Sequence, residues 1–187
     1  MDKVSLLLTL YSIVAGLGIS RLVQGVTAMI QVRSNLRFYW MHTAWIVIIF
    51  LAHITSWFAL LRFASGAHWT VFNAMLTLFM PIVLYVASDL VVPPLHAERH
   101  TDLREYFFRN CRWLAGLMLG FVALGGAVQV AVVHHVDFSG GGLLRILTLV
   151  TLVAGVSSRR PAVQATQALV LLAVGIAGAA LISDKLM

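Results

Sequence analysis

The chain has 187 residues, of which 60% are hydrophobic and only 11% are charged, and its mean hydropathy is +0.93. Soluble domains carry about a quarter charged residues, so this chain has too little polar surface to cover a globule in water. The net charge of +6 does not indicate nucleic-acid binding. In a membrane protein, excess arginine usually lies at the cytoplasmic rim and faces anionic headgroups. The composition therefore predicts a multi-pass membrane protein in contact with anionic lipid.

Six apolar stretches, joined mostly by short connections, divide the chain. They cover residues 4–30, 39–61, 70–92, 112–133, 143–157 and 162–182. The first is too long for the apolar region of a signal peptide, and the fifth, at about 15 residues, needs a locally thinned bilayer to cross it. We expect an all-α bundle of six transmembrane helices, formed as a single domain over residues 1–187, with a cytoplasmic amphipathic loop at 93–111.

The basic residues near the span ends are unevenly distributed between the two sides. One side has Arg33, Arg37, Arg99, Arg104, Arg109, Arg112, Arg159 and Arg160, and the other has Lys3, Arg62, Arg145 and Lys185. The positive-inside rule makes the first side cytoplasmic. The prediction is therefore that both termini lie outside.

Two histidines lie inside the second stretch, at His42 and His53. Eleven residues at about 100° each return a helix to nearly the same heading, so both imidazoles share one face, roughly 16 Å apart. For His53 three interpretations stay open. The first is a neutral ring hydrogen-bonded to a neighbouring helix. The second is a proton or ion pathway from His53 to His42 and Asp89. The third is ligation of haem b, with Met80 as the second ligand.

Two further ionisable residues lie within the spans, Arg21 in the first and Asp89 in the third. Because such residues are costly in lipid, each indicates a functional site by default. Arg21 either snorkels to the inner headgroups or pairs with Asp89, which lies at a similar depth. We expect Arg21, His42, Tyr85 and Asp89 to form one buried polar cluster.

Small residues recur in the spans, with Gly18 and Gly25 in the first and the GxxxG motif Gly116–Gly120 in the fourth. Small residues let helix backbones approach closely. They indicate either packing within the bundle or a subunit interface in a homo-oligomer.

The segment before the fourth span alternates aromatic residues with Arg104, Arg109 and Arg112. This pattern is typical of an interfacial anchor with its arginines among the headgroups. A docking surface for a cytoplasmic partner protein, formed by residues 96–112, is the alternative.

Motifs for chemistry are scarce. Cys111 is the single cysteine, and the adjacent His134 and His135 would face different ways on a helix, so no metal site is predicted. The sequence has no GxSxG, no HExxH and no paired carboxylates, and we expect no enzyme activity.

Four segments, YSIVAGLGISRL, RFYWMHTAW, FLAHITSWF and DLREYFFRNCRW, are similar to a group of small six-span bacterial inner-membrane proteins without a known activity. The resemblance implies a bacterial inner-membrane location and six spans. We predict a channel-like, transporter-like or sensing protein for a small ion or solute, with a polar line through the residues named above.

Overall fold

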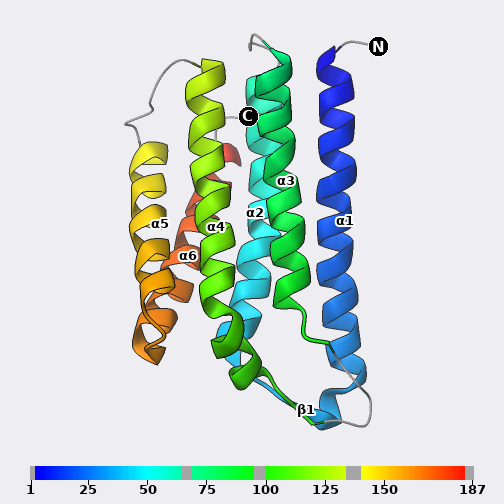
Figure 1. Cartoon of the computed structure of the whole chain (residues 1–187), viewed down its shortest axis with the longest axis vertical. Coiled ribbons are helices and arrows are strands. Elements are labelled where there is room, and N and C mark those ends of the chain that lie inside the picture. The colour runs from blue at the N-terminus through cyan, green and yellow to red at the C-terminus, as the bar shows by residue number, and fades with distance from the viewer. Residues whose placement is uncertain (1–2, 65–68, 95–99, 134–139, 184–187) are drawn as a thin grey trace.

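The computed structural model describes residues 3–64, 69–94, 100–133 and 140–183, and within them the chain is a bundle of six α helices (Figure 1). The helices are α1 (Lys3–Gln31), α2 (Trp40–Ala64), α3 (Val71–Val91), α4 (Leu103–Val133), α5 (Gly140–Ser157) and α6 (Pro161–Ser183). Two short strands, β1 (Leu36–Arg37) and β2 (Thr101–Asp102), and the 3-10 turn η1 (Arg33–Asn35) lie in the connections.

Five of these helices are long and apolar enough to cross a membrane, and α5 is a shorter apolar helix. A helix needs about 20 apolar residues to span the hydrocarbon core. The protein is therefore a multi-pass membrane protein built from helices. The sequence predicts that the fifth span is short, and α5 is the shortest of the six helices at 18 residues.

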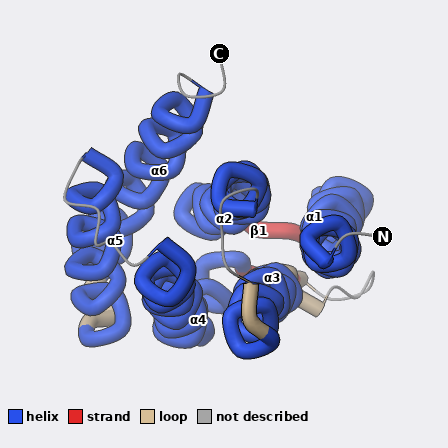
Figure 2. The backbone as a smooth tube through the Cα atoms, turned by 90° about the horizontal axis from the view of Figure 1, so that it is seen from above, coloured by secondary structure: helices blue, strands red, loops and turns tan. Residues whose placement is uncertain are grey.

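Helix α2 lies at the centre and contacts α1, α3, α4 and α6 (Figure 2). Its sequence is apolar on all sides, which is typical of a helix that neighbours surround. Trp45 and Ile49 are fully buried in the core around it. The two histidines of α2 are therefore inside the bundle.

Helix α1 packs through a line of small residues. A Cβ atom added at Gly18 would lie 2.5 Å from His53 Nε2, and one at Gly25 would lie 2.7 Å from Val92 Cγ1. Real side chains do not approach that closely, so glycine is required at both positions for α1 to lie against α2 and α3. In α1, Gly18 and Gly25 thus serve packing within the bundle.

The GxxxG motif of α4 behaves differently. A Cβ atom at Gly116 or Gly120 would meet nothing within 4 Å among the described residues. Close packing inside the bundle therefore does not explain this motif, which leaves a subunit interface as the other alternative.

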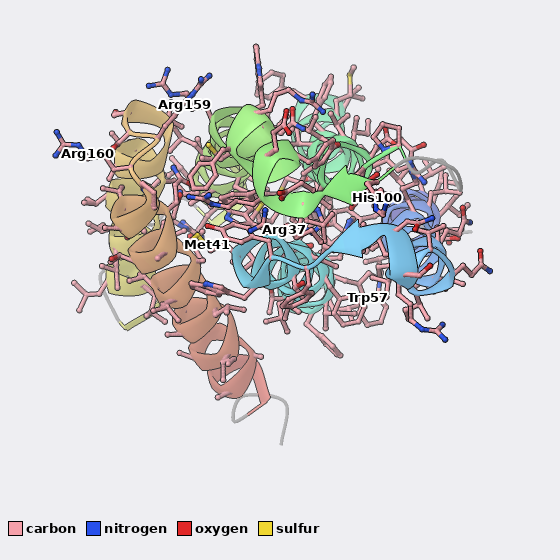
Figure 3. All side chains as sticks on the ribbon, turned by 90° about the horizontal axis from the view of Figure 1, so that it is seen from below. Arg37, Met41, Trp57, His100, Arg159 and Arg160 are labelled. Atoms are coloured by element: carbon pink, nitrogen blue, oxygen red, sulfur yellow. The ribbon has the colours of Figure 1, made fainter. Side chains whose placement is uncertain are left out.

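The connections at one end of the bundle are joined by a parallel pairing of β1 with β2, in which Leu36 faces Thr101 and Arg37 faces Asp102 (Figure 1). Figure 3 views this end, where Arg37 lies near the centre and Arg159 and Arg160 lie at the α5–α6 turn. We call this the arginine end and the opposite end, where α1 begins, the N-terminal end.

The fourth helix begins at Leu103 and not at Arg112, where the sequence pattern predicts its start after an amphipathic loop. Leu103, Phe107 and Cys111 recur every four residues and are buried in the core. Their side chains pack against the bundle, which extends α4 by more than two turns. Residues 103–111 of the predicted loop 93–111 are therefore helix.

Asp102 starts α4. Its carboxylate accepts hydrogen bonds from the amides of Arg104 (2.8 Å) and Glu105 (3.4 Å) and pairs with Arg37 (3.2 Å). Slight burial acts to raise the pKa of Asp102, but the amide hydrogen bonds and the Arg37 charge outweigh it, so the pKa lies below the ordinary 3.8.

We expect Gly25→Ala to lower the free energy of unfolding by about 1–3 kcal/mol, because the new methyl group overpacks against Val92. The matched control is Gly16→Ala, since a Cβ there meets nothing within 4 Å and alanine favours helix. Thermal unfolding in one detergent compares the two. Equal losses for both variants would contradict the close approach.

The lowered pKa of Asp102 predicts a pH dependence. A carboxylate whose pKa is depressed by folding stabilises the fold above its unfolded pKa, and this stabilisation is lost as pH falls through the folded pKa. The difference in melting temperature between wild type and Asp102→Asn should be constant near neutral pH and shrink below about pH 4. A difference that does not change with pH would show that the charge of Asp102 has no part in stability.

Candidate functional site

His53 is held between α1 and α3. Its side chain is only 1% exposed, and Nε2 lies 3.1 Å from Ser88 Oγ. The Ser88 hydroxyl gives its single proton to the Leu84 carbonyl at 2.8 Å, so it must accept from His53. This assigns the neutral tautomer with hydrogen on Nε2. Nδ1 is then a bare acceptor, buried and without a hydrogen-bond partner among the described residues.

Other polar side chains lie near His53 on the N-terminal side. The Ser56 hydroxyl donates to the His53 carbonyl at 3.0 Å. The buried Tyr11 hydroxyl lies beside the Ser56 side chain but makes no hydrogen bond of ordinary geometry within the described residues. Beyond them, Trp57 Nε1 donates to Ser12 Oγ at 2.9 Å. We call Tyr11, His53, Ser56 and Ser88 the seam residues, because they lie where α1, α2 and α3 meet.

Arg21 and Asp89 form an ion pair between α1 and α3, with Nε and Oδ1 2.6 Å apart. Asp89 follows Ser88 directly, and Arg21 lies one turn after Gly18. The pair is not buried, since the side chains are 35% and 59% exposed. Because successive helical residues point about 100° apart, a Ser88 that faces inward turns Asp89 toward the outer surface.

The predicted single buried cluster is therefore divided in the structure. Tyr85 lies on the outer surface near Asp89, four residues earlier on the same stripe of α3, and is exposed. His42 is buried, but its hydrogen-bond partner is not one of Arg21, Tyr85 or Asp89.

His42 caps the end of α3. Its Nε2 lies 2.8 Å from the Val91 carbonyl, so this nitrogen must carry the hydrogen. The Tyr106 hydroxyl donates to the Leu90 and Val92 carbonyls at 2.8 and 3.2 Å, and its ring meets the His42 ring edge-on. The last carbonyls of a helix have no hydrogen-bond partners within that helix. His42 and Tyr106 provide those partners for α3.

Buried apolar side chains separate His42 from His53 along α2. The α2 stripe between them carries Trp45 and Ile49, which are fully buried. The structure thus gives the two histidines different surroundings, although they share one face of α2.

The arrangement around His53 does not fit haem. Nε2 is already engaged by Ser88, and the ring fills the notch at Gly18, where even a methyl group has no room. Met80, the predicted second ligand, lies toward α4, since a Cβ at Gly125 would be 3.3 Å from its Cε. No group of three or more His, Cys, Asp or Glu side chains that could hold a metal is found among the described residues. His134 and His135 lie outside these residues.

Side chains from other helices also donate hydrogen bonds to carbonyls at the end of α5, as they do for α3. The buried Gln164 side chain donates to the Gly155 and Ser158 carbonyls at 3.0 and 2.7 Å. Arg112 donates to the Ser157 carbonyl at 3.3 Å, so this arginine binds α5 as well as facing outward. Arg104 and Arg109 are exposed on the first turns of α4.

Sequence reasoning missed several of these residues. Ser88, Tyr106 and Gln164 are common residue types in membrane helices, and only their contacts distinguish them. A signal for Ser88 was available, because it directly precedes the only acidic residue of the third span.

Comparisons of the chain with protein-family models, with curated proteins and with solved structures found no match.

Arg21→Gln and Asp89→Asn should each lower thermal stability in detergent, because each leaves a charge without its partner. We expect the double variant to be no less stable than either single variant, with a coupling energy of about 1 kcal/mol or less because both side chains are partly exposed. The double-mutant cycle measures this coupling. Additive losses would mean that the two charges act independently.

Proposed function

We propose that this multi-pass membrane protein senses or passes a proton at the seam between α1, α2 and α3, with His53 as the group that takes it up. The observation that carries the proposal is the buried His53 ring, which donates from Nε2 to Ser88 and keeps Nδ1 free. An imidazole can accept a proton on one nitrogen and release one from the other. In His53, Nδ1 is free to accept a proton, and Nε2 carries one toward Ser88.

The surrounding residues are consistent with a proton rather than a larger ion. Only one carboxylate, Asp89, lies within the helices that form the seam, among the described residues, and Arg21 neutralises it. A metal cation needs several oxygen ligands, which the seam does not offer. On the N-terminal side the seam continues through the hydroxyls of Ser56, which donates to the His53 carbonyl, and of Tyr11.

In this proposal the proton leaves at the Arg21–Asp89 ion pair, on the arginine-end side of His53. Arg21 and Asp89 lie about 27 Å along their helices from Lys3 and Val71, at 1.5 Å per residue. This is close to the thickness of the hydrocarbon core, about 30 Å. With the N-terminal ends at one boundary, the pair is at the other, where an exposed carboxylate is in contact with water and headgroups.

The membrane placement belongs to the proposal. The positive-inside rule puts the arginine end in the cytoplasm and both termini outside, in a bacterial inner membrane. A homo-oligomer is part of it as well, supported by the open face at Gly116 and Gly120. A membrane subunit that docks a partner protein is the second candidate, favoured by the exposed Arg104 and Arg109 on α4.

The test is proton flux into liposomes that hold the purified protein and a pH-sensitive dye, under an imposed potential. We expect His53→Gln to reduce the flux at least about tenfold, because glutamine keeps a donor toward Ser88 but takes up no proton. Ser88→Ala should reduce it less. The control is Tyr85→Phe, whose hydroxyl is outside the seam.

Wild-type flux equal to that of empty liposomes would overturn passage. Proton sensing would then stand only if a spectroscopic pH titration detects an ionisable group in the wild type that is absent from His53→Gln. If neither signal depends on His53, the seam serves packing alone, and the docking subunit becomes the better proposal.

A further inference from the structure

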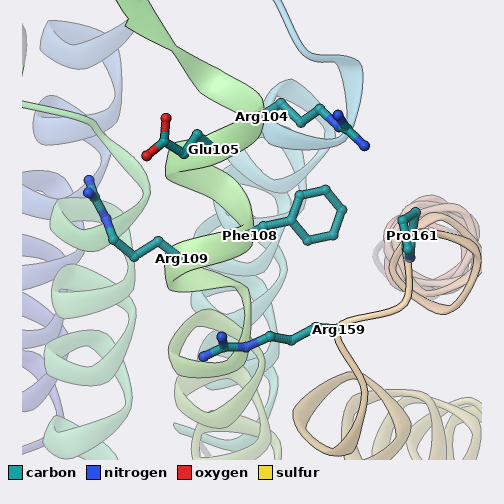
Figure 4. A pocket seen from close by; sticks show the side chains of 6 residues that line it. All are labelled: Arg104, Glu105, Phe108, Arg109, Arg159 and Pro161. Atoms are coloured by element: carbon teal, nitrogen blue, oxygen red, sulfur yellow. The ribbon is translucent and has the colours of Figure 1, made fainter.

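A cleft of about 530 Å³ lies at the arginine end, between the first turns of α4 and the start of α6. It is lined by Arg104, Glu105, Phe108, Arg109, Arg159 and Pro161 (Figure 4). Arg104 and Phe108 point from α4 toward the start of α6, and Arg159 reaches back toward α4 (Figure 4). Glu105 and Arg109 point to the other side of α4. The two guanidinium groups that flank the cleft thus come from segments far apart in the sequence.

Aromatic neighbours hold Arg104 in place. Its guanidinium carbon lies 5.9 Å from the centre of the Phe108 ring. It also acts on Tyr39: burial raises the pKa of this phenol, and the nearby Arg104 charge opposes part of the increase. Arg104 therefore lies against Phe108 at the cleft.

The positive charge of the cleft is not neutralised within the described residues. The two ion pairs found there use Arg21 and Arg37. Glu105 is the only acidic residue that lines the cleft, and its side chain is directed away from α6 (Figure 4). Arg104 and Arg159 flank the cleft with no carboxylate directed between them, which favours an anion.

The start of α6 adds a smaller contribution of the same sign. Pro161 is its first residue and has no amide hydrogen. The amides of residues 162 and 163 have no hydrogen-bond partner among the described residues, since the first bond of the helix is that from the Gln164 amide to the Arg160 carbonyl at 3.1 Å. Free amides and the helix dipole both favour negative charge at this point.

The depth of the cleft indicates what the anion is attached to. Trp113, on the adjacent turns of α4, is 72% exposed, and Trp40 is exposed at the same end. Exposed tryptophans are enriched at the membrane–water boundary. Phe108 and Pro161 give the cleft an apolar wall beside the arginines. Its size and mixed lining fit one headgroup with the start of its chains, whereas an acidic protein segment would need a longer groove.

We propose that this cleft binds a phosphate group, with Arg104 and Arg159 donating hydrogen bonds to its oxygens. Planar guanidinium groups match phosphate oxygens in pairs, and bonds between charged partners are the strong ones. The site is independent of the seam, so either proposal can fail without the other. An anionic phospholipid headgroup and free phosphate share this chemistry, and the test separates them.

The experiment titrates the full-length protein in a neutral detergent with short-chain phosphatidylglycerol, short-chain phosphatidylcholine or inorganic phosphate, and follows binding by thermal shift and native mass spectrometry. We expect phosphatidylglycerol to bind at least about tenfold more tightly than phosphatidylcholine, and Arg104→Gln with Arg159→Gln to weaken it about tenfold. Phosphate alone should stabilise only weakly.

The charge-matched control is Arg33→Gln with Arg160→Gln. Both arginines are exposed at the same end, neither lines the cleft, and Arg160 projects away from the bundle (Figure 3). This double variant should change binding by less than about twofold. If the glutamine variant of the cleft does not fold, Arg104→Lys with Arg159→Lys keeps the charge and loses the paired geometry, and should weaken binding several-fold.

Equal weakening by the cleft and control variants would overturn the site and leave only diffuse attraction to anionic lipid. Equal affinity for the two lipids in the wild type would also overturn it. Tight phosphate binding that depends on Arg104 and Arg159, without a lipid preference, would assign the site to free phosphate and reject the headgroup.

Discussion

The close approach of α1 to α2 and α3 is the contact on which the other features depend. It requires that Gly18 and Gly25 have no side chains, because the His53 ring and Val92 occupy the space where a Cβ substituent would extend. With α1 at this distance, Ser88 and His53 are enclosed, and Arg21 reaches Asp89 on the outer edge of the same seam. Lipid offers no hydrophobic contrast between helices, so such shape complementarity has to supply much of the association.

The two histidines of α2 show how one residue type takes different roles in a membrane bundle. His42 and Tyr106 satisfy the last carbonyls of α3, and Gln164 and Arg112 do the same for α5. Backbone groups without partners cost several kcal/mol in a bilayer, so side chains from neighbouring helices are drawn to helix ends. His53 lies in mid-helix and donates to the Ser88 side chain instead of to a helix end, and Nδ1 of both histidines has no hydrogen-bond partner among the described residues.

The charged groups are separated along the bundle. Arg21 and Asp89 neutralise each other on the surface of the seam, whereas Arg104 and Arg159 face a cleft without a described carboxylate partner. We propose that the ion pair exchanges protons and that the two arginines at the cleft attract an anion, so the paired and the unpaired charges take different roles.

The sequence by itself determined the helices and the class of protein. Apolar runs of sufficient length require helices in lipid, and the arginines collect in the same connections because charge is excluded from the hydrocarbon. Similar reasoning placed Arg21 and Asp89 at a similar depth. Only the tertiary structure decided how far each helix is rotated about its axis. That rotation turns Asp89 outward beside an inward Ser88, buries Leu103 and Phe107 so that α4 starts early, and leaves Gly116 open where Gly18 is filled. Rotation depends on which neighbours supply matching shapes and hydrogen-bond partners, and no single stretch of sequence contains that information.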